Sequence, residues 1–319
     1  MRIAFVTAEF APFVKLGGLA DVAAGLSAAL ARLGHDVSVF CPYYSHAAAF
    51  LERAWDTRRF VTVEYPEKSY HLGLYHHVTD NGVHVNFLRY DDLFGRAGVY
   101  DDDGYAYPDN DLRFAVFQQG VIAALALQNT PIDILHCNDW HTGLMPAYLA
   151  AAASRASGLV RTKTVFTIHN LLHQGVFPRT RFAALNLPAS FDSPDWLEHF
   201  GDSNFMKCAL AHADALTTVS PTYAREIRTP EYGCGFDGLL KQRSDSLHGI
   251  LNGIDSSVWS PEHDPFLPAN FSAANLSGKA VCKRALLART GLPRIAGAPL
   301  FGLVARLTYQ KGIDLVCDI

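Results

Sequence analysis

A lysine and two glycines stand close together near the start of the chain, between two apolar segments. Lys15, Gly17 and Gly18 follow the short β-branched run 2–7 and precede apolar residues at helical spacing over 19–33. Glycines at such a strand-to-helix turn let backbone N–H groups approach an anion, whose charge the helix dipole favours. Lys15 adds a positive charge beside them. The turn therefore favours phosphate binding, and an ordinary glycine turn beside a surface lysine is the alternative.

The spacing of this turn differs from two familiar phosphate-binding motifs. It is neither the G-x-G-x-x-G of dinucleotide-binding folds nor the G-x-x-x-x-G-K-S/T of P-loop enzymes. An α/β-hydrolase is also disfavoured, because the chain has no G-x-S-x-G. These absences exclude familiar classes of site and leave both phosphate binding and an ordinary glycine turn open.

Further polar residues follow apolar runs that we predict to be strands: Asp139, His141, His169, Asn170 and Arg306. Ligands of open α/β sheets bind outside the carboxyl ends of the strands, where all of these residues are expected. Taken singly, Asp139 is explained by a helix N-cap and His169 by a structural role in the core. Their joint occurrence at strand ends predicts a binding or catalytic site.

The order of the predicted elements indicates a doubly wound α/β domain followed by the beginning of a second one. Strands are predicted at 2–7, 36–40, 132–137, 163–168, 215–219 and 249–251. Helices are predicted at 19–33, 112–128, 142–153 and 203–212, with another opened by Pro221. An antiparallel insertion over 60–88, with a hairpin at Asn81-Gly82, interrupts this alternation.

The second domain is expected to begin after a linker. Residues 260–278 are rich in Pro, Ser, Ala and Asn, and a strand at 300–305 with a helix start near Gln310 follows. We therefore divide the chain into a first domain, 1–256, and a linker with the incomplete start of a second domain, 257–319.

The composition describes a globular protein. With 319 residues, a net charge of −4 and 49% hydrophobic residues, neither disorder nor nucleic-acid binding is favoured. No apolar stretch is long enough for a membrane helix, so no membrane partner is expected. The six cysteines are scattered without a C-x-x-C pair, which argues against zinc and predicts a cytoplasmic protein.

Two other groups of possible metal ligands are explained without a metal. The acidic run 101–103 lies in a long polar loop, which we predict over 91–110, and it reads as a solvated turn. His76 and His77 are neighbours on one predicted strand, so their rings face opposite sides of the sheet. No metal site is therefore predicted.

Read together, the motifs resemble those of the bacterial glycogen synthase and plant starch synthase family, glucosyltransferases with the two-Rossmann GT-B fold. The matching segments run in order over nearly the whole chain: 15–22, 109–117, 136–141, 167–175, 218–227, 250–261 and 306–312. The resemblance implies a GT-B protein whose first Rossmann-like domain carries the β-hairpin insertion.

The resemblance also implies an activity and its substrates. The family transfers glucose from an ADP-glucose donor to an α-1,4-glucan acceptor with retention of configuration, and no cofactor or metal is expected. Lys15 is implied as a donor contact, with Gly17 and Gly18 at the diphosphate. Arg306 and Lys311 are implied as the cations that neutralise this diphosphate.

The remaining family positions lie near the glucosyl and acceptor groups. Those implied as catalytic are Asp21, Asp139 and His169. Those implied as substrate-binding are Asn110, His141 and Asn170. No protein nucleophile is expected, because in this family the leaving phosphate oxygen is the proposed proton acceptor.

The family pattern continues well past the Arg306–Lys311 motif, whereas this chain ends at Ile319. We therefore expect a fragment without most of the donor site, inactive or weakly active as it stands. A non-catalytic glucan-binding module and another GT-B sugar-nucleotide enzyme remain as alternatives. The choice between ADP-glucose and UDP-glucose also stays open.

Overall fold

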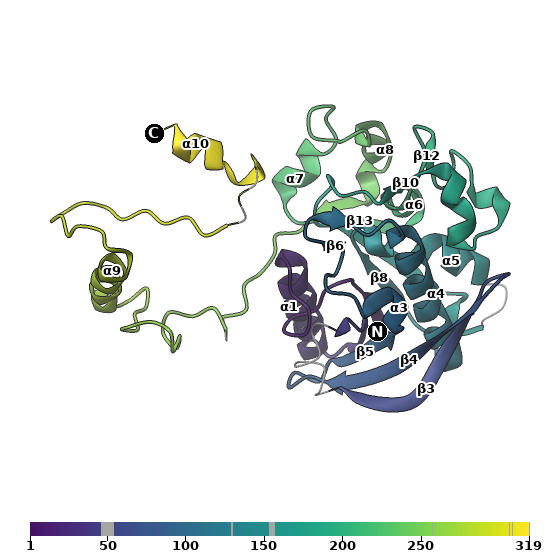
Figure 1. The fold of residues 1–319 in the computed structure, drawn as a ribbon, viewed down its shortest axis with the longest axis horizontal. Coiled ribbons are helices and arrows are strands. Elements are labelled where there is room, and N and C mark those ends of the chain that lie inside the picture. Colours follow the sequence, from purple (N-terminus) through teal and green to yellow (C-terminus); the bar gives the residue numbers. More distant parts are fainter. Residues whose placement is uncertain are drawn as a thin grey trace. The chain divides into compact units, whose positions relative to one another are not determined.

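The computed structural model describes residues 1–45, 54–128, 130–152, 157–256, 258–305, 307 and 309–318 (Figure 1). These form two compact units, unit 1 over Met1–Gly253 and unit 2 over Ile254–Ile319.

Unit 1 is built on a nine-stranded sheet with the order β14-β13-β9-β8-β1-β2-β5-β4-β3. Its strands are β1 (Arg2–Val6), β2 (Asp36–Pro42), β3 (Trp55–Glu64), β4 (Ser69–Val78), β5 (His84–Arg89), β8 (Ile134–Asn138), β9 (Lys163–Ile168), β13 (Ala215–Thr218) and β14 (Leu247–Gly249). From β14 through β5 all neighbours are parallel, and β4 is antiparallel to both β5 and β3.

The centre of the sheet is apolar because it is covered on both sides. Ala4, Phe5 and Val6 of β1 are fully buried, as expected for an inner parallel strand. The chain moves from β1 to β2 on one side and later from β8 to β9 on the other. This doubly wound order confirms the predicted parallel α/β architecture and sets the switch in winding direction between β1 and β8.

The helices and small sheets of unit 1 connect these strands. The helices are α1 (Gly18–Arg32), α3 (Asp91–Phe94), α4 (Asn110–Gln128), α5 (Met145–Ala152), α6 (Phe205–His212), α7 (Pro221–Glu226) and α8 (Asp237–Gln242). Short 3-10 turns are η2 (Trp140–Thr142), η3 (Ser157–Leu159), η4 (Arg179–Leu185), η5 (Ala189–Phe191) and η6 (Ser244–Ser246). The remaining strands pair as β6 (Asp101–Asp102) with β7 (Tyr105–Ala106), and as β10 (Val176–Phe177) with β12 (Asp202–Asn204) and β11 (Glu198–His199).

The predicted hairpin insertion belongs to the main sheet. Its turn lies at 79–83, where Gly82 has a φ of +76° and the Thr79 N–H donates to the carbonyl of Val83. The second strand of the hairpin, β5, also pairs in parallel with β2, with Ser38 opposite His84. The apolar residues of β5 make this possible, because an inner strand must bury both faces.

Two local predictions are wrong in position. The strand predicted at 249–251 is β14 at 247–249, where Leu247 is buried while Leu251 is 74% exposed. The predicted loop 91–110 contains α3 and the small hairpin β6–β7. At β14 the buried side chain of Leu247, rather than the most apolar triplet, marks the residues that pair.

Unit 2 contains α9 (Ser277–Thr290), η7 (Tyr309–Lys311) and α10 (Ile313–Cys317). The strand predicted at 300–305 is wrong, since residues 300–304 form no ladder with any described segment and Phe301 is 88% exposed. A strand exists only when a neighbour satisfies its backbone groups, and the described part of unit 2 offers no such neighbour. Within the described residues, no helix is long and apolar enough to cross a membrane.

The exposure of 300–304 predicts fast amide exchange. Hydrogen exchange followed by mass spectrometry should show little protection there and strong protection over residues 3–6, which lie in the centre of the sheet. Equal protection of the two segments would show that unit 2 folds into a stable sheet of its own.

Candidate active site

The turns after β1 and β8 lie side by side at the switch point of the sheet. Val6 is opposite Cys137 in the β1–β8 ladder, and Asn138 is opposite Thr167 in the β8–β9 ladder. The carboxyl ends of the three strands are therefore level. Ligands of doubly wound sheets bind at this switch point, and the turns here carry Lys15, Asp139 and His169.

Asp139 holds the end of β9 through its side chain. Its Oδ1 accepts hydrogen bonds from the backbone N–H groups of His169 (2.8 Å) and Asn170 (3.4 Å). The side chain makes no cap hydrogen bond to the following 3-10 turn, so the N-cap explanation does not hold. Its φ of +56° is in the left-handed region, a conformation that costs a non-glycine residue about 1–3 kcal/mol and is typical of functional sites.

Burial gives Asp139 an unusual protonation equilibrium. The residue is 7% exposed, and burial raises its pKa to about 7, against the lowering effect of the two N–H bonds. The nearby charge of Glu9 raises the pKa of Asp139 further. The carboxyl group is therefore partly protonated near neutral pH, and it can then donate a hydrogen bond as well as accept one.

His169 is held as a neutral imidazole beside this carboxyl group. Burial lowers the pKa of His169 to about 4. Its Nε2 lies 3.0 Å from Oδ1 of Asn138, whose amide nitrogen donates to the carbonyl of Val6 at 3.1 Å. Because Oδ1 only accepts, Nε2 carries the proton and Nδ1 is left as an acceptor.

The glycine turn already contains a buried carboxylate, that of Glu9. This residue is 4% exposed, and its Oε2 accepts the N–H groups of Leu16 (2.8 Å) and Gly17 (3.1 Å). Its Oε1 accepts the hydroxyl of Tyr100 at 2.8 Å. Sequence reasoning missed Glu9, although a single acidic residue inside the apolar run 8–14 was the available signal.

The lysine of the turn is paired with another expected site residue. Nζ of Lys15 lies 2.8 Å from Oδ1 of Asp21, in the first turn of α1, and both side chains are half-exposed. Gly17 precedes α1 with extended backbone angles, and Gly18 begins the helix.

Asn110, His141 and Asn170 lie nearby but have partners within the protein. The amide of Asn110 donates to the carbonyl of Tyr100 (2.9 Å) and accepts from Arg113 (2.6 Å). The ring of His141 stacks on Tyr100 with centroids 4.5 Å apart, and burial lowers the pKa of His141 well below its usual value. Oδ1 of Asn170 accepts the N–H of Leu172 at 3.1 Å.

Nδ1 of His141 is buried and has no hydrogen-bond partner among the described residues.

The two expected cations of the second domain belong to unit 2. Lys311 ends η7 and is exposed, and Arg306 lies outside the described residues. Across the described residues there is no group of three or more His, Cys, Asp or Glu that could hold a metal ion.

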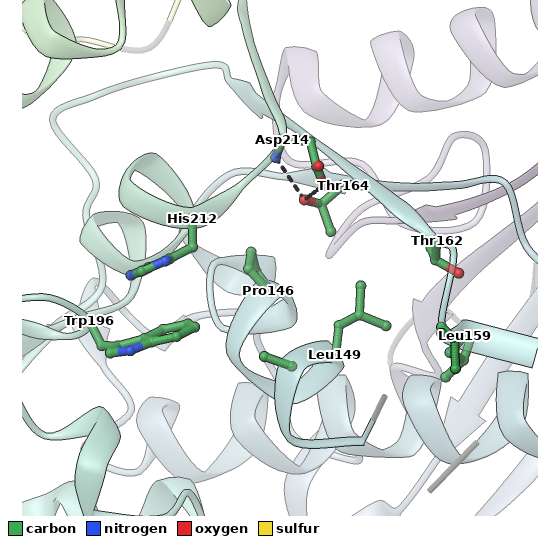
Figure 2. A pocket seen from close by; sticks show the side chains of 10 residues that line it. Pro146, Leu149, Leu159, Thr162, Thr164, Trp196, His212 and Asp214 are labelled. Atoms are coloured by element: carbon green, nitrogen blue, oxygen red, sulfur yellow. Dashed lines mark hydrogen bonds between the residues drawn. The ribbon is translucent and has the colours of Figure 1, made fainter. Parts of the chain in front are cut away.

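A hollow of about 250 Å³ lies at the opposite edge of the sheet (Figure 2). It is lined by Thr164 of β9, by Asp214 just before β13, and by the rings of Trp196 and His212, which stack 3.6 Å apart. None of the expected site residues lines it.

The raised pKa of Asp139 predicts a measurable effect of pH on stability. The folded chain keeps this proton up to about pH 7, while the unfolded chain loses it near 3.8, so ionisation of the buried group destabilises the fold as pH rises. Relative to the wild type, the free energy of unfolding of Asp139→Asn should therefore increase by about 2.6 kcal/mol between pH 5 and pH 8.

Denaturant unfolding of both proteins at the two pH values measures this difference. His136 and His169, whose pKa values burial lowers to about 3 and about 4, change stability in the opposite direction below pH 6.5. They do so in both proteins and cancel in the comparison. A stability difference that stays constant with pH would contradict the assignment.

The chain matches the family model described as starch synthase catalytic domain over residues 2–242. It is 48% identical over 321 residues to a glycogen synthase of Myxococcus xanthus, and 42% identical over 317 residues to one of Opitutus terrae. These alignments cover 100% and 99% of this chain, and 66% of each relative.

The fold agrees with that of a solved relative. The catalytic domain of starch synthase IV from Arabidopsis thaliana, bound to ADP and acarbose, superposes with a TM-score of 0.89 at 33% identity. The match covers 99% of this chain and 65% of that structure, and it confirms the predicted GT-B fold class. The chain thus spans about 66% of the length of the curated relatives it matches, and it belongs to the glycogen and starch synthase family.

Proposed function

We propose that unit 1 forms the acceptor side of a glycogen synthase, which transfers glucose from ADP-glucose to the non-reducing end of an α-1,4-glucan with retention of configuration. Unit 2 contributes to the sugar-nucleotide side. The names of the relatives, and the ADP and acarbose bound to starch synthase IV, support these substrates.

The two glycines of the turn carry the proposal. Neither Gly17 nor Gly18 has a φ in the left-handed region. Apart from the adjacent residues and the backbone of α1, no atom of the described part of the chain lies within 4 Å of the position a Cβ would take. By contrast, Gly175 has a φ of +66°, and a Cβ there would lie 2.4 Å from the ring of Trp140. The conformation and packing of unit 1 account for Gly175 but not for Gly17 and Gly18, whose open space is suited to an approaching ligand.

The charges near the turn determine how much further positive charge the donor diphosphate needs. Transfer leaves a diphosphate, and cations or helix N-termini that hold it lower the barrier. Lys15 and the N-terminus of α1 are suited to this role, since exchanging an exposed partner such as Asp21 costs at most about 1 kcal/mol. With Glu9 and Asp139 nearby, further cations are needed, and the family resemblance assigns this role to Arg306 and Lys311.

Asp139 and His169 are assigned to the sugar hydroxyl groups. A carboxyl group with a pKa of about 7 both donates and accepts hydrogen bonds. The neutral imidazole of His169 uses its Nε2 proton for Asn138 and offers Nδ1 as an acceptor. Neither group is required as a nucleophile. The proton acceptor is the leaving phosphate oxygen.

Glucosyl transfer to glycogen tests the proposal directly. Labelled ADP-glucose and UDP-glucose are each supplied to the chain and to a protein of the relatives' length that contains it. We expect transfer from ADP-glucose by the longer protein. Glycogen binding by the longer protein without transfer from either donor would favour a glucan-binding module, and transfer only from another sugar nucleotide would favour a different GT-B enzyme.

Removal of the Lys15 charge should weaken use of the donor. In the longer protein, Lys15→Ala is expected to lower kcat/KM for ADP-glucose. The loss should correspond to about 1.5–3 kcal/mol of transition-state stabilisation, the contribution of a charge-assisted hydrogen bond. Lys163→Ala is the matched control, because Lys163 forms a similar pair with Asp214 (2.7 Å) at the opposite edge of the sheet. Equal kinetics of the two variants would remove Lys15 from the donor site.

A methyl group at Gly17 should affect the ligand and not the fold. Gly17→Ala fits the extended backbone without a contact, so its melting temperature should stay within about 2 °C of the wild type. The KM for ADP-glucose should rise about 10-fold or more if the ligand occupies this space. Gly25→Ala, in open space within α1, serves as control, and an unchanged donor KM at Gly17→Ala would contradict the assignment.

A further inference from the structure

The backbone of Glu9, in the turn after β1, is held by local hydrogen bonds. Its N–H donates to Oγ1 of Thr7 (3.3 Å), and the same hydroxyl donates to the carbonyl of Glu9 (2.9 Å). The segment after it closes on itself, since Phe10 and Val14 exchange backbone hydrogen bonds of 3.0 and 2.9 Å. Both of these side chains are buried in the core. The carboxylate therefore projects from a fixed support.

The carboxylate occupies the amide groups that a phosphate would otherwise use. Leu16 and Gly17 both direct their N–H groups at Oε2, which fills this part of the anion-binding turn. A second anion cannot accept the same hydrogens, and the charge of Glu9 repels it at this point. The donors left to an incoming phosphate are Lys15 and the N–H groups at the start of α1.

The second carboxylate oxygen of Glu9, Oε1, links the glycine turn to other segments of the site. It accepts the hydroxyl of Tyr100, whose ring stacks on His141 and whose carbonyl accepts the amide of Asn110. One buried carboxyl group thus joins the turn after β1 to the segment before α4 and to the turn after β8. The turns after β1 and β8 contain Lys15 and His141, and Asn110 is the first residue of α4.

We propose that Glu9 is a positioning residue of this site: its carboxylate fixes the backbone of Leu16 and Gly17, so that Lys15 and the start of α1 form the phosphate contact. The inference rests on the proposed function, because it names how the donor side of that site is arranged. Glu9 acts through the turn and not by contact with the donor.

Amide exchange of this chain tests the hydrogen bonds from Leu16 and Gly17 to Glu9, and the measurement requires no enzymatic activity. In Glu9→Ala, exchange at Leu16 and Gly17 should accelerate by about 10- to 100-fold, as expected for loss of a hydrogen bond to a charged acceptor. Glu9→Gln keeps an acceptor oxygen and should accelerate it much less.

Asp214→Ala is the matched control for this measurement. Asp214 also holds a backbone N–H, that of Thr164 at 2.9 Å, but at the opposite edge of the sheet. Exchange at Thr164 should change there, with Leu16 and Gly17 unaffected. Unchanged exchange at Leu16 and Gly17 in Glu9→Ala would overturn the inference.

Kinetics of the longer protein test the consequence for the donor. Glu9→Ala should raise the KM for ADP-glucose about 10-fold or more with a smaller change in the KM for glycogen, and Glu9→Gln should restore most of the loss. Asp214→Ala should lower the melting temperature and leave the donor KM unchanged.

The outcomes separate the inference from the proposed function. If the wild-type protein transfers no glucose, the proposed function is contradicted. The exchange experiment still shows whether Glu9 holds the N–H groups of Leu16 and Gly17. A wild-type protein that transfers glucose, with a Glu9→Ala donor KM like its own, overturns the positioning role. If Glu9→Ala does not fold, Tyr100→Phe decides, because it removes the hydroxyl that holds Oε1 of Glu9. Faster exchange at Leu16 and Gly17 with a raised donor KM in this variant supports the role, and wild-type values overturn it.

Discussion

Two buried carboxyl groups at one edge of the sheet determine how the loops of unit 1 are arranged. Glu9 and Asp139 are both almost inaccessible, and among the described residues neither has a lysine or arginine partner. A buried charge without such a partner is costly unless hydrogen bonds satisfy it. Backbone N–H groups do so here, from 16–17 for one residue and from 169–170 for the other. The turns after β1 and β9 must therefore stay in place for the fold to remain stable.

The parallel core was predictable from the sequence because each inner strand must be apolar on both faces. The run 163–168 coincides with β9, and Pro221 begins α7 at its first position, as the capping pattern indicates. The prediction failed where pairing depends on a distant partner. Residues 300–304 have the composition of an inner strand but no neighbour in the described part of unit 2, and composition alone does not reveal that.

The positions of the candidate site residues at strand ends were predictable from the sequence, but their hydrogen-bond partners were not. The location of Asp139 and His169 at strand ends follows from the alternation of strands and helices. Their bond does not, because it joins residues 30 positions apart in sequence. Likewise, Asn110 matches a family motif, yet its amide is used by Tyr100 and Arg113, which only the fold brings to it.

Asp214, at the opposite edge of the sheet, is a useful comparison for Asp139. Asp214 also binds a backbone N–H, but it has Lys163 as partner and its side chain is 40% exposed. Burial acts to raise the pKa of Asp214, but the bonds from Lys163 and Thr164 outweigh it and leave that pKa below its usual value. The same chemical group thus has a lowered pKa at one edge and a raised pKa at the other.

That difference has a consequence for an anionic ligand at the switch point. With Glu9 and Asp139 lacking cationic partners, the edge repels a diphosphate unless cations or a proton offset the charge. Lys15 supplies one cation. In the proposed function the donor diphosphate binds at this edge, and a nearby anion favours the protonated form of Asp139. Asp139 at the switch point is therefore close to its pKa near neutral pH, whereas the lowered pKa of Asp214 keeps that carboxylate ionised at the opposite edge of the sheet.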